Sequence, residues 1–438
     1  MDSSNPESSS NHAKNGPKAK GRHEEKRPAR KSSNQLQKGI QDFLERLPSS
    51  IFSDNGLSLE IISSSLPKRY TVYQPLLLLS ANAFSAPAPW GALYAVLNED
   101  QRQDLYASML KAFSGTSVTH MAINAPITLT DTQGHENRMR SPVGLIPLHG
   151  YFGHLRSGDG EEVQPMESDF ENALWVRTLQ NNGIIQVWAP LYTMFSRGNI
   201  TEKARILGHG GLFEGLDELS LGGDSVEEIS VVDMYAGIGY FVFSYLRRGV
   251  KRVWGFELNG WSVEGLRRGC MENGWGCKVV KVQNDGKLDE SLPELVRNLK
   301  DTDRVVIFHG DNRFAADIIN ETKGIMEAQG AWSSIRHVNL GLLPSSRPAW
   351  DSACKMLDFQ RGGWAHVHEN VAIQDIDQMK EDIVFEMTRL RTQDQDRLKP
   401  AKLALAAECR HVEHVKTYAP GVMHCVFDIK IPSYDSCP

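Results

Sequence analysis

The segment Ile229–Phe241 (ISVVDMYAGIGYF) constrains the fold of this chain more than any other. Its first apolar run ends at Asp233, and a turn containing Gly237 and Gly239 separates it from a second apolar run. This order is typical of a buried parallel strand that passes through a tight turn into a helix, where a nucleotide-like ligand finds room. Glycines also punctuate ordinary strand–helix connections, so a purely structural turn remains an alternative.

An acidic residue follows the next strand-like run along the chain. The segment Val253–Glu257 (VWGFE) is apolar up to its final carboxylate. A carboxylate at the end of the second strand of such a sheet suits the paired hydroxyls of a ribose. The two segments together predict a nucleoside-cofactor site that includes Tyr235, Gly237 and Glu257.

Strand-like and helix-like segments alternate from residue 229 onward, which predicts a doubly wound α/β sheet. The expected strands are Ile229–Met234, Arg252–Glu257, Lys278–Val282, Val305–His309, Ile335–Leu340 and Trp364–Glu369. The expected helices are Gly239–Arg248, Trp261–Asn273, Arg347–Phe359 and Asp375–Leu390. A closing hairpin is expected from His414–Tyr418 and Met423–Ile429, and the polar stretch Gln283–Thr302 is interpreted as a surface-loop insertion.

Composition shifts suggest three parts. Residues 1–38 are polar and basic and should be disordered, residues 39–168 should form a smaller N-terminal α+β domain, and residues 169–438 should form a Rossmann-like catalytic domain. In the middle part, Asp100–Phe113 has helical spacing of its apolar residues. The stretch Asp169–Asn181 is expected to be a helix, followed by a strand at Gly183–Trp188.

Composition also limits the setting in which the chain works. The net charge is −6, so a nucleic-acid partner would have to be met by local basic patches. No apolar run approaches the roughly 20 residues that cross a bilayer, and the first residues have no apolar signal segment. The six cysteines form no CxxC pair, which favours reduced thiols in a cytoplasmic protein.

Two further clusters follow predicted strands. In His309–Arg313 (HGDNR), the pair Asp311 and Asn312 could accept from an adenine amino group and donate to a ring nitrogen. An Asx turn that caps the next helix is the alternative. In Asn339–Ser346 (NLGLLPSS), Asn339 could bond a base edge or the cofactor, although a structural loop fits the same pattern.

One more cluster, Phe195–Lys203 (FSRGNITEK), precedes the first strand of the sheet, and its basic residues could hold a carboxylate or phosphate. The histidine pairs His366/His368 and His411/His414 lack a third ligand at suitable spacing, so no metal site is expected. No GxSxG nucleophile elbow or Walker phosphate loop is present in the sequence.

Taken together, these segments resemble the tRNA wybutosine-synthesising aminocarboxypropyltransferase family, which is related to the tRNA guanine-37 N1-methyltransferases. The resemblance extends from about Leu66 to Ile429. It is carried by SRGNITEKAR (Ser196–Arg205), DMYAGIGYF (Asp233–Phe241), ELN (Glu257–Asn259), GDNR (Gly310–Arg313) and NLGLLPSS (Asn339–Ser346), with LPKRYTVYQPLLLL (Leu66–Leu79), NAPI (Asn124–Ile127) and RSP (Arg140–Pro142) upstream.

The resemblance implies transfer of the 3-amino-3-carboxypropyl group of S-adenosylmethionine to C7 of a tricyclic guanine derivative at position 37 of phenylalanine tRNA, beside the anticodon. It assigns the ribose to Glu257 and the adenine to Asp311 and Asn312. Ser196 and Lys203 would hold the methionine end and turn it toward the base. Asn339 and the loop containing Pro344 would shape the base pocket, and these two are the expected catalytic residues.

The sequence departs from the family where Gly260-Trp261 replaces a usual proline and where Gln283–Thr302 lengthens the chain before Asp311. The sister N1-methyltransferases have an Asn-Leu-Pro motif, whereas this chain has Gly341 in place of that proline, which favours aminocarboxypropyl transfer. A tRNA-binding protein with a degenerate cofactor fold is the remaining alternative. We expect a cytoplasmic monomer that binds tRNA and no membrane.

Overall fold

The computed structural model describes residues 34–124, 144–154, 164–193, 195, 199–398 and 406–433. Most of the predicted N-terminal tail, the RSP motif and Ser196 lie outside the described residues. The first described helix, α1 (Gln35–Leu44), starts a few residues before Gly39, where order was expected to begin.

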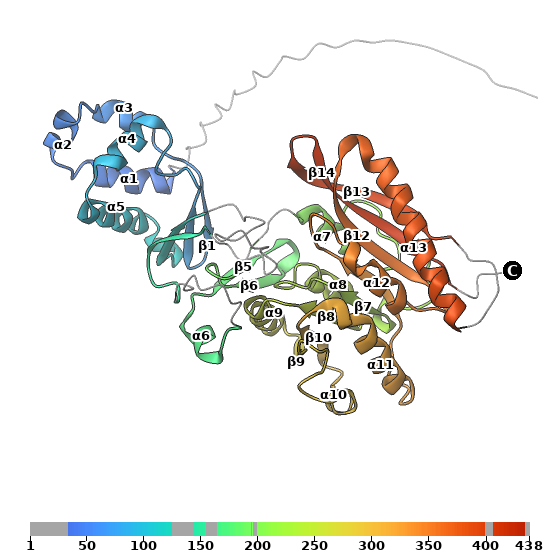
Figure 1. The fold of residues 1–438 in the computed structure, drawn as a ribbon. Helices are drawn as coiled ribbons and strands as arrows, with labels where there is room; N and C mark the ends of the chain where they lie inside the picture. The colour runs from blue at the N-terminus through green and yellow to red at the C-terminus, as the bar shows by residue number, and fades with distance from the viewer. Residues whose placement is uncertain are drawn as a thin grey trace, which may run out of the picture.

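An eight-stranded sheet forms the larger part of the molecule (Figure 1). Its strand order is β13-β14-β12-β11-β7-β8-β10-β9. In this order, the neighbouring strands from β12 through to β9 run parallel. Strand β14 runs antiparallel to both of its neighbours, β12 and β13. The strands are β7 (Ser230–Asp233), β8 (Arg252–Glu257), β9 (Gly276–Lys281), β10 (Asp303–His309), β11 (Ile335–Leu340), β12 (Gly363–Ala372), β13 (Glu408–Ala419) and β14 (Val422–Ile431).

Helices cover both faces of this sheet, which explains why its strands are apolar at consecutive positions. In β7, Val232 packs into the core on one face and Val231 into the core on the other. The first core is completed by α11 (Ala315–Glu327), α12 (Trp350–Met356) and α13 (Ile376–Leu398), and the second by α8 (Val242–Arg248) and α9 (Gly260–Asn273). The predicted doubly wound α/β sheet is confirmed.

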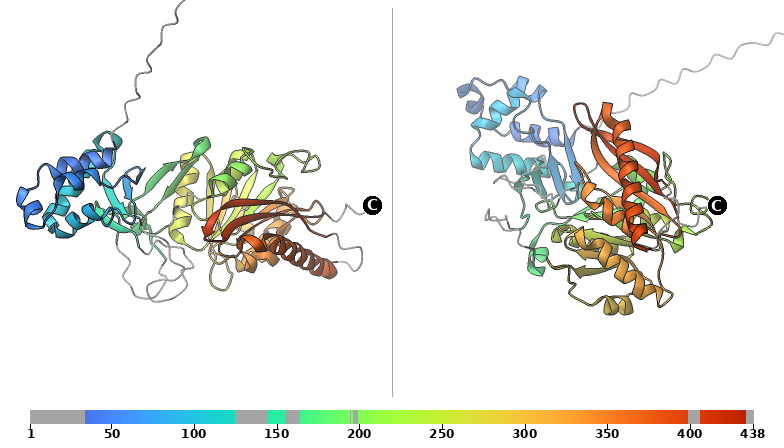
Figure 2. Two further views of the ribbon diagram at one scale, coloured as in Figure 1. Left: turned by 90° about the horizontal axis from the view of Figure 1, so that it is seen from above. Right: turned by 45° about the vertical axis from the view of Figure 1, so that its right-hand side comes forward.

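The N-terminal part has a four-stranded sheet in the order β1-β2-β3-β4, covered by short helices. The predicted helix Asp100–Phe113 corresponds to α5, and its apolar residues Leu105, Met109 and Phe113 are buried. These elements lie at one end of the molecule, and the β13–β14 hairpin with α13 lies at the other (Figure 1 and Figure 2, left). The elements are α2 (Ser49–Asp54), α3 (Leu59–Ser64), α4 (Ala88–Val96), α5 (Glu99–Lys111), β1 (Tyr70–Tyr73), β2 (Leu76–Leu79), β3 (His120–Ile123) and β4 (Ile146–His149).

Two sequence expectations are wrong. The helix expected at Asp169–Asn181 is instead α6 (Glu167–Asn172) followed by β5 (Val176–Leu179), which pairs with β6 (Ile185–Trp188). Burial alternates along β5 with the period of two that marks a strand. The stretch Gln283–Thr302 is also more than a loop, because it contains α10 (Leu292–Asn298). Apolar residues of α10 at helical spacing are buried in the core.

Among the described residues, no helix combines the length and apolar character needed to span a membrane.

Candidate cofactor and substrate site

The four strand-end clusters predicted from the sequence meet at the carboxyl edge of the sheet. The central strand β7 has β8 on one side and β11 on the other, so the strand order reverses beside β7. Open α/β sheets bind ligands at such a reversal. The register places Asn339 beside Asp233 and His309 beside Glu257.

The turn after β7 requires its glycines. Gly237 has φ +54° and Gly239 has φ +86°, a left-handed conformation that disfavours other residues. A Cβ on Gly239 would lie 2.6 Å from the ring of Phe243. Because the two glycines carry no side chains, the backbone of the turn is uncovered at these positions just before α8.

Glu257 holds this turn against the start of α9. Its Oε2 accepts a hydrogen bond from the amide of Gly237 at 2.8 Å, and its Oε1 accepts one from the amide of Asn259 at 2.8 Å. Burial raises the pKa of Glu257 above its ordinary value. Each carboxylate oxygen can accept a second hydrogen bond, which leaves capacity for two hydroxyl donors.

Asp233 and Asn339 form a buried pair at the ends of β7 and β11. Asp233 Oδ1 accepts from Asn339 Nδ2 at 3.2 Å and from the amide of Tyr235 at 3.2 Å. Asp233 Oδ2 and Asn339 Oδ1 are buried acceptors without a hydrogen-bond partner. Burial, together with the nearby charge of Glu257, raises the pKa of Asp233 to about 7. Two such acceptors suit a ligand that carries several N–H donors.

Asp311 and Asn312 follow β10 beside Glu257. Asn312 Nδ2 donates to the carbonyl of Met234 at 2.7 Å, which ties this segment to the end of β7. Asp311 Oδ1 accepts from the amide of Arg313 at 3.0 Å, so the Asx turn weighed as an alternative is present. Both side chains are partly exposed.

Lys203 lies on α7 (Ile200–Ile206) and is only 9% exposed. Its Nζ donates to Gln186 Oε1 at 3.3 Å and lies 5.3 Å from the centre of the Tyr240 ring. Burial lowers the pKa of Lys203 to about 8. No carboxylate among the described residues forms an ion pair with Lys203. The Nε2 of Gln186 is buried and has no hydrogen-bond partner.

A cavity of about 430 Å³ opens beside Lys203, and Gln186, Tyr240 and Ser244 line it as well. The ring of Tyr240 also lies against the glycine turn, since a Cβ on Gly237 would be 2.8 Å from it. The cavity therefore begins directly beyond the turn that Glu257 holds.

The loop after β11 is held to β12 by Glu369, whose Oε1 accepts from the amide of Ser346 at 2.9 Å and from the hydroxyl of Ser345 at 3.1 Å. The carbonyl of Pro344 accepts from the amide of Asn370 at 2.8 Å. Pro344 is exposed, whereas Asn339 is fully buried. Of the two expected catalytic residues, Asn339 thus lies near the end of the buried strand β11, whereas Pro344 lies in the loop that follows it.

The structure adds residues that the sequence did not single out. Gln186 and Tyr240 line the cavity, and Glu369 anchors the predicted base-pocket loop. The signal for Gln186 was a polar residue inside the apolar strand IIQVW, since buried polar side chains need partners. Glu369 had no comparable signal, because its partners lie 23 and 24 residues away.

These features define the class of the molecule as a Rossmann-like protein with a candidate nucleoside-cofactor site at its strand ends. No family model matches the chain. The tRNA wybutosine-synthesizing protein 2 of Schizosaccharomyces pombe is 35% identical over 366 residues, covering 83% of this chain and 73% of that protein. The protein of the same name from Saccharomyces cerevisiae is 32% identical over 414 residues, covering 87% and 79%. This chain belongs to the tRNA wybutosine-synthesizing protein 2 family, which confirms the resemblance drawn from its motifs.

The solved structure of Pyrococcus horikoshii TYW2 in complex with MeSAdo is also similar. It is 16% identical, covers 90% of this chain and 98% of that chain, and gives a TM-score of 0.49.

Proposed function

We propose that this chain transfers the 3-amino-3-carboxypropyl group of S-adenosylmethionine to C7 of the tricyclic guanine at position 37 of phenylalanine tRNA. The observation that carries the proposal is family membership, with identities of 35% and 32% over most of both chains. The chain is then an S-adenosylmethionine-dependent tRNA aminocarboxypropyltransferase of wybutosine biosynthesis.

The residues at the strand ends fit the nucleoside half of S-adenosylmethionine. Glu257 would accept the two ribose hydroxyls beside the backbone amides that it already holds. Asp311 and Asn312 lie at the neighbouring strand end and would contact the adenine. Tyr235 and Gly237 belong to the turn that approaches the nucleoside.

The amino-acid arm of the cofactor fits two groups of unsatisfied side chains. The free acceptors Asp233 Oδ2 and Asn339 Oδ1 suit an α-ammonium, which has only donors. Lys203 and the free amide of Gln186 suit a carboxylate, which has only acceptors. The resemblance adds Ser196 to this end of the site.

S-adenosylmethionine supplies a sulfonium whose three neighbouring carbons are all electrophilic. The protein selects among them by orientation, because attack needs the reacting atoms in line and close together. Side chains that hold both charges of the arm would fix the γ-carbon toward the base. Asn339 and the Pro344 loop, held by Glu369, would shape the pocket that receives the base.

We also propose that the chain acts as a cytoplasmic monomer on the anticodon loop, with residues 39–168 as an N-terminal domain that contacts the tRNA. The cysteines in the described part of the chain form no disulfide, which supports a reducing compartment; they are Cys270, Cys277, Cys354, Cys409 and Cys425.

The product of the reaction tests the proposed function directly. Purified protein is incubated with S-adenosylmethionine and phenylalanine tRNA that carries the tricyclic intermediate, and the digested nucleosides are analysed by mass spectrometry. We expect a gain of about 101 Da from the aminocarboxypropyl group. A gain of about 14 Da would identify a methyltransferase instead, and an unchanged nucleoside would indicate a binding protein.

The pH dependence of binding tests the role of Lys203. Because the pKa of Lys203 is about 8, its side chain is mostly protonated below that pH and loses its proton above it. A carboxylate ligand favours the ammonium, so the affinity for S-adenosylhomocysteine should fall as pH rises from 7 to 9, by at most about tenfold per pH unit. The ligand itself also titrates in this range, and it does so equally with both proteins. Calorimetry on the unmodified protein and on Lys203→Met therefore isolates the contribution of Lys203. A ratio of the two affinities that does not change with pH would exclude Lys203 from the carboxylate site.

A further inference from the structure

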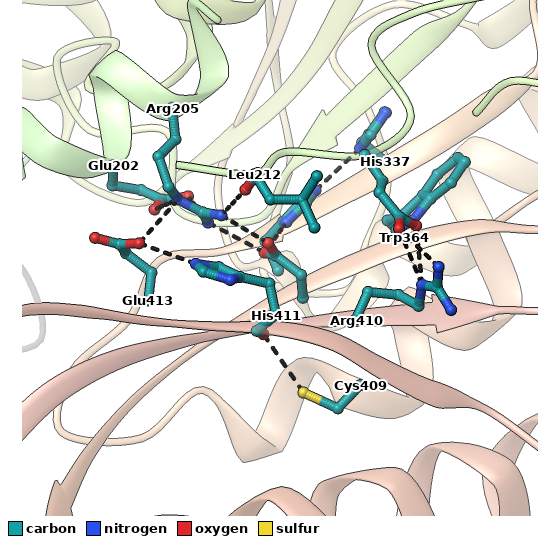
Figure 3. A network of polar contacts seen from close by, with 12 residues as sticks. Glu202, Arg205, Leu212, His337, Trp364, Cys409, Arg410, His411 and Glu413 are labelled. Atoms are coloured by element: carbon teal, nitrogen blue, oxygen red, sulfur yellow. Dashed lines mark hydrogen bonds and ion pairs between the residues drawn. The ribbon is translucent and has the colours of Figure 1, made fainter. Parts of the chain in front are cut away.

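A network of buried polar side chains joins α7 to the C-terminal half of the large sheet (Figure 3). Arg205, one turn after Glu202 on α7, is 2% exposed. Its Nε donates to Glu202 Oε2 at 2.9 Å, and its Nη1 donates to Asp428 Oδ2 on β14 at 2.9 Å. Lys203 therefore lies on a helix that Arg205 joins to the sheet.

Two buried histidines continue the network from Asp428 across the sheet. His366 Nδ1 on β12 is 2.7 Å from Asp428 Oδ1, and His366 Nε2 is 2.9 Å from His337 Nδ1 on β11. His337 Nε2 is 2.7 Å from the carbonyl oxygen of Gly215. Both rings are at most 1% exposed, so water cannot replace any of these contacts.

The order of donors and acceptors fixes where the protons are. The carbonyl of Gly215 can only accept, so His337 Nε2 carries a proton. Burial lowers the pKa of His337 well below its ordinary value, so His337 is neutral and its Nδ1 is an acceptor. His366 must then donate from Nε2 to His337.

The other nitrogen of His366 faces an ionised carboxylate. The guanidinium of Arg205 favours the ionised form of Asp428, because it donates to Oδ2 from Nη1 at 2.9 Å and to Oδ1 from Nη2 at 3.4 Å. The pKa of Asp428 is lowered although burial alone would raise it. A carboxylate oxygen 2.7 Å from a bare ring nitrogen would place two acceptors against each other, so Nδ1 of His366 carries a proton as well. His366 has both ring nitrogens protonated.

We infer that His366 is a buried imidazolium and that it is a positioning residue, which holds Asp428 and Arg205, and through them α7 and Lys203, in the geometry that binds the arm of the cofactor. This inference rests on the proposed role of Lys203. In this arrangement, the two cations His366 and Arg205 lie against the two carboxylates Asp428 and Glu202.

The surroundings of His366 support a fixed charge. The ring of Phe213 stacks on it at 4.6 Å between centroids, and Tyr245 of α8 lies 6.5 Å away. On β13, Glu413 is 3.6 Å from Arg205 and pairs with His411 at 3.0 Å. His368 is the next histidine on the same face of β12. A neutral His366 would leave Asp428 with Arg205 as its one cationic partner among the described residues.

Nuclear magnetic resonance of the full chain labelled with ¹⁵N-histidine tests the protonation state. At pH 7.5 we expect one histidine with both ring nitrogens protonated and slow exchange with solvent. The variants His366→Gln and His366→Asn should each lose this signal, and either one suffices for the assignment. A spectrum in which every slowly exchanging ring carries one proton would overturn the inference.

Ligand binding tests the positioning role, with two probes that differ only beyond the nucleoside. S-adenosylhomocysteine carries the amino-acid arm, and methylthioadenosine lacks it. We expect His366→Gln to weaken S-adenosylhomocysteine about tenfold, or about 1.4 kcal/mol, and to leave methylthioadenosine unchanged within about twofold. The exposed His414→Gln is the matched control and should change neither affinity.

Two outcomes separate this inference from the proposed function. If His366→Gln weakens both probes equally, the residue is merely structural and the positioning role is wrong. If Lys203→Met leaves both affinities unchanged, the proposed arm site fails, while the nuclear magnetic resonance spectrum still decides the state of His366.

Discussion

Replacing Glu257 with alanine should weaken the binding of S-adenosylhomocysteine by about 1–3 kcal/mol, the range for losing a charged hydrogen-bond partner. The carboxylate has two expected tasks. It would accept the ribose hydroxyls, and it already holds the amides of Gly237 and Asn259 at 2.8 Å each. The loss should therefore appear with methylthioadenosine as well, because both ligands contain the ribose. Isothermal titration calorimetry with the two ligands measures the effect.

Glu272→Ala is the matched control for this experiment. Glu272 lies near the end of α9, whose N-terminus Glu257 supports, and it forms an exposed ion pair with Arg177. Its removal should leave both affinities unchanged. Equal affinities for Glu257→Ala and the unmodified protein would mean that Glu257 does not bind the ribose.

Replacing Arg205 with methionine should lower the free energy of unfolding by about 3–5 kcal/mol, the range for breaking a buried ion pair from one side. The methionine fills much of the same volume, but Asp428 and Glu202 would lose the guanidinium that contacts both. Burial raises the pKa of Glu202 to about 7 even with Arg205 beside it, so removal of the guanidinium would disfavour the carboxylate further. Urea unfolding followed by tryptophan fluorescence gives the free energy.

The control is Arg177→Met, which breaks a salt bridge whose side chains are 54% and 42% exposed. Exposed pairs contribute about 0–1 kcal/mol, so this change should be small. If the two arginine variants lose the same amount, the network around Arg205 does not stabilise the fold as its geometry implies.

The sheet was predictable because its signal is local. In β8, residues 253–256 are apolar at consecutive positions and the charged Glu257 ends the run, so the predicted bounds matched the structure. The predicted bounds of β11 also matched, although Arg336, His337 and Asn339 interrupt its apolar residues. The prediction failed at β5, where the chain between α6 and β6 has mixed composition. The pairing with β6 decides its conformation there, and a pairing partner is not visible in the segment itself.

The candidate site was predictable to the extent that its residues follow strands. Glu257, Gly237 and Asn312 lie together because the carboxyl ends of parallel strands meet at one edge. The contact between Lys203 and Gln186 joins α7 to β6, and the network of Arg205 and Asp428 joins residues 223 positions apart. Such contacts depend on how helices and hairpins dock on the sheet, which no spacing in the sequence records.

The ring of Tyr240 separates the space beside the glycine turn from the cavity beside Lys203. A donor molecule bound here would be contacted at its sugar and at its terminal carboxylate, with the ring of Tyr240 between the two contacts. Such a site selects donors by the distance between their sugar and their carboxylate, and it does not select by the small alkyl substituent on sulfur. Donors that differ only in that substituent would then deliver the same fragment to the nucleic acid.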